Sequence, residues 1–306
     1  MIEANETFGG TWPYKPCFSN APGFRMHYVD EGQGEVILCL HGEPTWGYLY
    51  REFIGPLSKN YRVVVPDHMG FGKSETPQDR EYTLKSHVEN LEALVLELDL
   101  TDITLVVQDW GGPIGGCLTA DHFDRVKRIF HMNTPFYPYA RLSQADTERF
   151  AASRWFTWIQ RAQKDGTLEA ILGSLDVTVT SVMKHLIGFE RSENIDENWE
   201  AAYGTPFKTF QECAGGIAFP IDFITGNFAY REPASDEERA ALRQKPAMLA
   251  CGMQDHAIPS EVTIAVFQDT FGADKPIVEL PNAGHFLQED EPGLLVALIE
   301  QFIQSN

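Results

Sequence analysis

Short apolar runs separated by longer helical stretches constrain the fold more than any other feature of this sequence. The runs are rich in Val, Ile and Leu and span residues 35–40, 61–66, 103–108, 126–132, 247–252 and 276–281. Runs this short and this apolar are typical of strands covered on both faces, as in a parallel sheet with crossover helices. The alternating segment 24–35 favours an antiparallel hairpin at one edge. We therefore predict an α/β chain built on a mostly parallel sheet with flanking helices.

The alternation of strands and helices breaks between about residue 133 and residue 240. This stretch holds amphipathic helical patterns, as at 148–162 and 168–177, and no clear strand. Strand-and-helix alternation resumes at Pro246, so the simplest arrangement is a helical cap inserted after the sixth strand. We predict a core domain of residues 1–133 and 241–306 and a cap domain of residues 134–240. The mouth of the cap would cover the carboxyl ends of the strands, where open α/β sheets place their sites.

The charge balance limits the partners of this protein. Lys and Arg number 24 against 44 Asp and Glu, which gives a formal net charge of −20. Such a surface repels nucleic acid and anionic lipid, and no basic run offsets it. No apolar run approaches the roughly 18 residues that a membrane span needs, and the first residues lack the pattern of a signal peptide. We expect a cytoplasmic protein that binds neither nucleic acid nor membrane.

A carboxylate stands where this kind of fold would carry a nucleophile. Asp109 directly follows the run 103–108, and Gly111, Gly112 and Pro113 open the next helix. A strand, a sharp turn with a reactive side chain and then a helix form a nucleophile elbow. The helix N-terminus keeps such a carboxylate ionised, which suits displacement of a good leaving group at an sp³ carbon or opening of a strained ring. A simple helix cap is the alternative interpretation of Asp109.

Three further strand-end loops carry reactive residues. His41 to Trp46 follow the run 35–40, Asp255 follows the run 247–252, and His285 follows the run 276–281. The chain order of nucleophile Asp109, acid Asp255 and base His285 is that of the α/β-hydrolase fold. In this fold, backbone N–H groups of the first of these loops and of the residue after the nucleophile bind an oxyanion. Those residues are Glu43 and Trp110.

With these loops in view, the sequence resembles the haloalkane dehalogenases. The resemblance covers nearly the whole chain and is strongest over residues 23–133 and from residue 246 onward. It rests on four motifs: HGEPTWGYLYR (41–51), PDHMGFGKSETP (66–77), VVQDWGG (106–112) and AGHFLQED (283–290). The HGEP motif and the Asp–His–Asp triad are similar to one particular branch of that family.

The resemblance implies a two-step hydrolysis of a carbon–halogen bond and a role in detoxification. Asp109 would displace the halide and form an alkyl ester, and water activated by His285 would then hydrolyse the ester. The partners are a small neutral halogenated substrate, water and halide, with no metal and no organic cofactor. The resemblance also implies a substrate pocket lined by Phe136, Phe207, Phe219, Ile258 and Phe286.

Two departures from the family pattern affect the assignments. Asn133 stands where another branch carries its catalytic acid, which assigns that role to Asp255. Glu43 stands where a further branch holds the halide with an Asn. We expect an ionised Glu43 to be an acceptor whose side chain points away, so that only its backbone N–H serves. Trp110 then needs a second halide donor from the cap, either Trp155 or Trp158, and we favour Trp155.

Other functions share parts of this pattern. An epoxide hydrolase would use the same triad with two cap tyrosines, although Gln108 stands where that family usually has His. A fluoroacetate-type dehalogenase would carry Arg in place of Trp110. A non-catalytic protein on this fold would typically have lost the nucleophile or the base, and this chain keeps both. The candidate tyrosines for epoxide opening are Tyr137, Tyr139, Tyr203 and Tyr230.

Overall fold

One eight-stranded sheet organises the protein. The computed structural model describes residues 2–306, and its strand order is β1-β2-β4-β3-β5-β6-β7-β8. All neighbours from β4 to β8 pair in parallel, whereas β2 is antiparallel to both β1 and β4. The strands are β1 (Cys17–Ser19), β2 (Met26–Gly32), β3 (Val36–Leu40), β4 (Arg62–Pro66), β5 (Ile103–Gln108), β6 (Val126–Met132), β7 (Ala247–Gly252) and β8 (Ile277–Leu280).

This sheet confirms the predicted α/β-hydrolase fold. The six apolar runs match β3 to β8 to within one residue at each end. The segment 24–35 contains an antiparallel strand, as predicted, but β2 does not form a hairpin with β3, because β4 lies between them, and β2 is not the edge strand. Cys17 to Ser19 form β1 outside it, and three residues are too few to leave an alternating pattern in the sequence.

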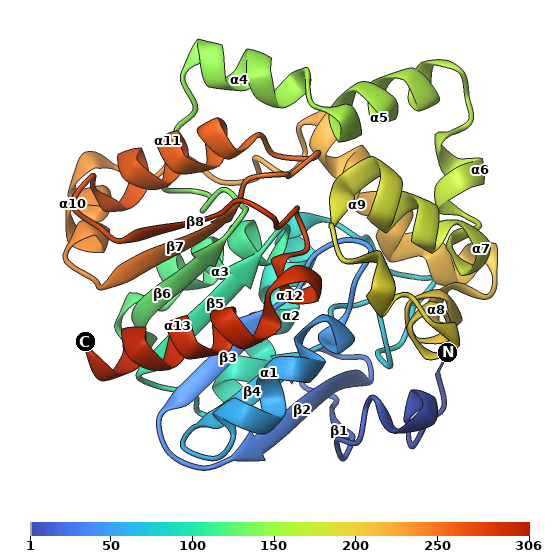
Figure 1. The fold of residues 1–306 in the computed structure, drawn as a ribbon, viewed down its shortest axis with the longest axis horizontal. Helices are drawn as coiled ribbons and strands as arrows, with labels where there is room; N and C mark the ends of the chain where they lie inside the picture. The colour runs from blue at the N-terminus through green and yellow to red at the C-terminus, as the bar shows by residue number, and fades with distance from the viewer. Residues whose placement is uncertain (1) are drawn as a thin grey trace.

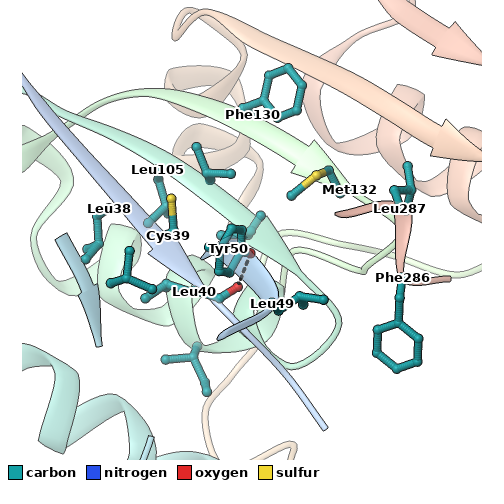
Figure 2. Packing of buried hydrophobic residues seen from close by; sticks show 14 of the residues in the cluster. Leu38, Cys39, Leu40, Leu49, Tyr50, Leu105, Phe130, Met132, Phe286 and Leu287 are labelled. Carbon is teal, nitrogen blue, oxygen red and sulfur yellow. Dashed lines mark hydrogen bonds between the residues drawn. The ribbon is translucent and has the colours of Figure 1, made fainter. Parts of the chain in front are cut away.

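Helices cover both faces of the sheet. α1 packs against α13 on the face nearest the viewer in Figure 1, and α2 packs against α3 on the opposite side. Between these layers, the side chains around Leu38, Cys39 and Leu40 form a continuous apolar core (Figure 2). The Tyr50 hydroxyl in this core donates to the Leu40 carbonyl at 2.8 Å. The core helices are α1 (Arg51–Leu57), α2 (Leu84–Glu97), α3 (Gly111–Asp121), α11 (Ser260–Phe271), α12 (Leu287–Asp290) and α13 (Pro292–Gln304).

The chain between β6 and β7 contains helices and, across its described residues, no strand. Figure 1 shows α4 and α5 across the top of the molecule, with α9 beside them. The α-helices of this segment are α4 (Gln144–Ala151), α5 (Arg154–Lys164), α6 (Leu168–Leu172), α7 (Leu175–Thr180), α8 (Glu197–Gly204), α9 (Ala214–Thr225) and α10 (Asp236–Arg243). The division of the chain at 240 stays a prediction. Because α10 packs against the core helix α11, a boundary before α10 fits the contacts better.

Buried polar contacts join the cap to the core. Glu289 on α12 forms an ion pair of 2.7 Å with Arg51 and accepts a hydrogen bond of 2.6 Å from the Tyr203 hydroxyl of α8. The Trp46 indole donates to the carbonyl of Ala202 at 2.9 Å. Because these groups are buried, loss of one partner would leave the other unsatisfied. These contacts place the cap over the strand ends. None of the described helices has the length and apolar character to cross a membrane.

Candidate active site

Asp109 lies at the sharp turn between β5 and α3. Its φ of 49° falls in the left-handed region, which a non-glycine residue rarely adopts without a functional or structural reason. Its carbonyl accepts from the backbone N–H of Gly112 at 3.0 Å and from the Thr134 hydroxyl. A side chain on Gly111 would come within 2.2 Å of the Leu40 carbonyl. The turn therefore requires glycine at position 111, two residues after Asp109. It directs the Asp109 side chain away from the sheet.

The Asp109 carboxylate remains open to the cavity. Oδ1 accepts a hydrogen bond of 2.7 Å from the backbone N–H of Glu43, and Oδ2 lies 3.3 Å from His285 Nε2. The side chain is 19% exposed, whereas the side chains of His285 and Asp255 are fully buried. A Cβ on Gly42 would lie 2.1 Å from Oδ1. The absence of a side chain at Gly42 thus gives the carboxylate its space.

His285 lies between two carboxylates. Its Nδ1 is 2.8 Å from Asp255 Oδ2, and its backbone carbonyl accepts from Gln108 Nε2 at 3.1 Å. Burial lowers the pKa of His285, but Asp255 and then Asp109 oppose this effect and raise the pKa to about 10. The two neighbouring carboxylates therefore favour the charged form of the imidazole in the free protein.

Both carboxylate oxygens of Asp255 have hydrogen-bond partners. Oδ1 accepts from the backbone N–H groups of Ala257 and Ile258 at 2.7 and 2.9 Å. Oδ2 accepts from Asn133 Nδ2 at 2.7 Å as well as facing His285. These contacts fix the carboxylate in one orientation, which suits a group that positions a base.

Asn133 is a site residue that the sequence analysis did not assign. It forms two further hydrogen bonds with Gly252 at the end of β7, so it joins the ends of β6 and β7. Its φ of 33° lies in the left-handed region, which Asn tolerates better than most residues. The available signal was its place at the end of β6, directly across from the loop of Asp255.

A largely apolar cavity of about 380 Å³ opens above Asp109. Its floor contains Glu43, Asp109 and Trp110, and its walls come mainly from the cap and from α11. Of the described residues 2–306, no Lys, Arg or His belongs to its lining. The cap side of the lining includes Leu142, Phe150, Trp155, Phe156, Ile159, Phe223 and Phe228, and the core side includes Ala257, Ile258, Val262 and Val266.

A profile of the alpha/beta hydrolase fold matches residues 35–292 of this chain. Haloalkane dehalogenase 2 of Mycobacterium tuberculosis is 32% identical over 300 residues, which cover 95% of this chain and 96% of that protein. The chain belongs to the haloalkane dehalogenase family. The tetrameric haloalkane dehalogenase DpaA of Paraglaciecola agarilytica is 28% identical, covers 97% of this chain and 94% of its own, and superposes with a TM-score of 0.73.

A second kind of protein is similar to this member of the dehalogenase family. The cis-3-alkyl-4-alkyloxetan-2-one decarboxylase of Xanthomonas campestris is 30% identical over 300 residues. The match covers 93% of this chain and 94% of that protein. The family resemblance alone therefore does not separate the two activities, and the site must do so.

The structure places one of the five expected pocket residues in the cavity lining. Ile258 lines the cavity, whereas the four phenylalanines lie behind it. The Phe219 ring stacks on Trp110 with centroids 4.4 Å apart, and the Phe286 ring meets His285 edge-on at 5.0 Å. Figure 2 shows Phe286 and Leu287 pointing to opposite sides of their segment. Phe136 packs on Phe271 and Phe207 on Phe71, in the core.

The two cap tryptophans differ in their access to the cavity. Trp155 is 6% exposed and lines the cavity. Trp158 lies on the same face of α5 and stacks on Trp155 with centroids 5.2 Å apart, but it does not reach the lining. Within residues 2–306, the indole N–H groups of Trp110 and Trp155 have no hydrogen-bond acceptor.

The surroundings of Glu43 do not support the expectation of an ionised carboxylate. Glu43 is 3% exposed and forms part of the cavity lining. Burial raises its pKa well above the usual value, and the charge of Asp109 raises it further. The burial that raises this pKa does not follow from the sequence alone.

The described residues contain no cluster of three or more His, Cys, Asp or Glu side chains that could hold a metal ion. Of the triad, Asp109 lines the cavity, and His285 and Asp255 lie buried behind it.

Proposed function

We propose that this protein hydrolyses the carbon–halogen bond of neutral haloalkanes through a covalent ester on Asp109. The proposal rests chiefly on one observation. A carboxylate that is open to an apolar cavity faces a buried histidine, and a fully hydrogen-bonded second carboxylate orients that histidine. Such an arrangement provides a nucleophile for the first step and a base for the second.

In the first step, an oxygen of Asp109 attacks the halogen-bearing carbon. The new C–O bond forms as the C–halogen bond breaks, and the halide leaves with the bonding electrons. Because the cavity wall is apolar, the attacking carboxylate is poorly hydrated there. Enclosure of the substrate in the cavity keeps its reacting carbon close to the carboxylate. The product is an alkyl ester of Asp109 together with a halide ion.

In the second step, water attacks the carbonyl carbon of the ester and His285 accepts its proton. Ester formation removes the charge of Asp109, which was one cause of the raised pKa of His285. The pKa of the imidazole therefore falls when a neutral base is needed. The backbone N–H of Glu43 already donates to Oδ1 of Asp109, so it is suited to bind the oxyanion together with the N–H of Trp110. Collapse of the intermediate releases the alcohol and restores Asp109.

The halide requires hydrogen-bond donors because an unpartnered anion in a dry cavity costs several kcal/mol. Trp110 and Trp155 both line the cavity, and among residues 2–306 neither indole N–H has an acceptor, so both are available as donors. Trp158 does not belong to the cavity lining. This arrangement favours Trp155 as the cap donor.

The substrate that suits this cavity is neutral and apolar. Its lining has acidic residues and no basic one, so a haloacid would meet a like charge without a partner. A cavity of about 380 Å³ is at the small end of the range for small-molecule sites. As inferred from the sequence, the proposal includes a cytoplasmic location and a detoxifying role.

The similarity to the Xanthomonas decarboxylase favours one second candidate, the decarboxylation of a 3,4-dialkyl-oxetan-2-one. A strained four-membered ring is a further target for a carboxylate nucleophile. Epoxide hydrolysis has less support. Of the four candidate tyrosines, only Tyr137 lines the cavity, and its hydroxyl is bound to the backbone of Arg231.

A substrate panel tests the assignment. Purified protein is incubated with chloro-, bromo- and iodoalkanes, with a styrene-oxide-type epoxide and with a cis-3,4-dialkyl-oxetan-2-one. Released halide, diol and CO₂ are measured in parallel, with Asp109→Ala as the blank. We expect halide from the bromo- and iodoalkanes. CO₂ or diol without halide would refute the proposed function.

A further inference from the structure

Among residues 2–306, Glu43 is the one acidic residue besides Asp109 in the cavity lining, and the two-step chemistry above uses only its backbone. We propose that the side chain of Glu43 is a neutral carboxylic acid that donates a hydrogen bond to the leaving group. This inference rests on the proposed function. It adds a donor to the two indoles and makes Glu43 a determinant of which leaving groups the site accepts.

The position of Glu43 supports this role. Its backbone N–H holds Oδ1 of Asp109 at 2.7 Å, so the residue is fixed directly beside the nucleophile. Glu43 belongs to the lining of the same cavity, together with Trp110. A substrate carbon within reach of Asp109 therefore brings its substituents near Glu43.

The surroundings of the Glu43 side chain favour the neutral form. Its Oε1 atom is buried and has no hydrogen-bond partner among residues 2–306. A carboxylate in such a place would lose its hydration without gaining a donor, which is far more costly than burying a neutral acid. No Lys, Arg or His belongs to the cavity lining, and the charged His285 contacts the other oxygen of Asp109.

The titratable groups nearby act in the same direction. Asp109 is the charged neighbour that raises the pKa of Glu43 in addition to burial. His41, two residues before Glu43, has a pKa well below its usual value because it is buried and lies near His68, so it supplies no positive charge. Tyr137, the remaining titratable group of the lining, has a raised pKa through burial and is likewise neutral.

A neutral acid has a chemical consequence for the leaving group. An O–H donor forms short, strong hydrogen bonds to an anion, and it repels no incoming halogen as a carboxylate would. The hydrogen bond stabilises a small anion with concentrated charge more than a large one. Binding of chloride should therefore depend on Glu43 more than binding of iodide does.

Two variants of Glu43 separate the donor role from bulk and from charge. Glu43→Gln keeps the shape, stays neutral and offers an N–H donor. Glu43→Leu keeps most of the volume but offers none. Chloride and bromide affinities are measured by quenching of tryptophan fluorescence, which reports on Trp110 and Trp155. We expect Glu43→Gln to bind chloride within about threefold of the wild type and Glu43→Leu to bind it about tenfold more weakly.

The protonation state is measured directly in the resting protein. The infrared difference between wild type and Glu43→Gln should contain the carbonyl band of a protonated carboxylic acid, with a shift in D₂O. Absence of this band overturns the proposal, and so does a Glu43→Leu variant that binds chloride like the wild type. Melting temperatures of the three proteins show whether a loss of binding reflects a loss of fold.

These outcomes are distinct from a failure of the proposed function. If the wild type releases halide from haloalkanes while Glu43→Leu retains wild-type chloride affinity, only the role of Glu43 fails. If the wild type neither binds nor releases halide, the dehalogenase assignment fails together with the role of Glu43.

Discussion

The strand-end loops of the core and the helices of the cap build opposite halves of the same cavity, and they do so by different physical means. In the core half, Asp255 has three amide donors in addition to His285. In the cap half, Phe150, Phe156 and Phe223 pack ring against ring, with centroids 4.4 to 5.5 Å apart. Directional hydrogen bonds fix the reacting groups, whereas non-directional packing shapes the space above them.

This difference indicates how the two halves should respond to substitution. A polar group in the core half positions one atom, so its removal should affect the chemical steps by orders of magnitude. An aromatic group in the cap half contributes area or one donor to binding, so its removal should have a graded effect. Single substitutions test this difference between the two halves.

The largest effect should come from Asp109→Ala. Without the carboxylate no ester can form, so kcat for halide release should fall by at least about 10³-fold. The fold should remain, because the side chain faces the cavity and does not pack in the core. Halide release and a melting curve test this directly. More than trace turnover from a protein with a wild-type melting curve would rule out Asp109 as the nucleophile.

His285→Gln should stop turnover after the first step. The nucleophile is intact, so the variant should release about one equivalent of halide per chain and then retain the alkyl ester. Mass spectrometry of the intact protein should detect the adduct. Loss of the initial burst would show that His285 is already needed for the attack, and the order of steps proposed above would be wrong.

Asp255→Asn should slow the second step and change its pH dependence. Only neutral His285 can accept a proton, so ester hydrolysis increases with pH until the pKa of His285 is reached. Asp255 is the largest of the factors that raise the pKa of His285, and its contribution persists after Asp109 has become an ester. Removing its charge should therefore move the increase to lower pH, while the maximal rate falls roughly 10²- to 10⁴-fold because the imidazole loses its orientation.

Single-turnover hydrolysis of the preformed ester, measured across pH in both proteins, tests the expectation for Asp255→Asn. An unchanged pH profile would show that Asp255 does not control the pKa of His285.

Asn133→Ala tests the hydrogen bond to Asp255 separately from its charge. It removes one donor from Asp255 and leaves the charge, so it should lower the rate with a smaller shift of the profile.

The same contrast explains what the sequence could predict. Asp109, Asp255 and His285 each follow an apolar strand, and the ends of neighbouring parallel strands meet at one edge of the sheet. Their proximity therefore follows from local patterns. The cap offers no such rule. Phe219 and Phe286 were expected in the cavity lining, but they lie behind Trp110 and His285. Their positions depend on ring packing between segments that are distant in the sequence, which the sequence pattern does not show.

The surroundings of Glu43 and the role of Asn133 could not be predicted from the sequence for a related reason. Their neighbours in the sequence identify the loops, but burial and long-range contacts decide their roles. The pKa of Glu43 depends on a dry cavity that the cap creates, and Asn133 acts on a loop that follows β7, more than 100 residues later.

The smallest effect should come from the cap tryptophans, and it tests whether the cap half contributes more than shape. Trp155→Phe keeps the ring in the lining and removes only the indole N–H. Trp158→Phe is the matched control, since Trp158 stacks on Trp155 outside the lining. Loss of one neutral donor to an anion should weaken chloride and bromide binding about tenfold, or about 1.4 kcal/mol. Trp158→Phe should bind both halides like the wild type. Fluorescence quenching, which still reports on Trp110, measures all three affinities. If Trp158→Phe loses the binding and Trp155→Phe does not, the donor is Trp158 and α5 must rotate when halide binds. If neither changes, the cap supplies shape alone, and the anion is held only by groups of the core.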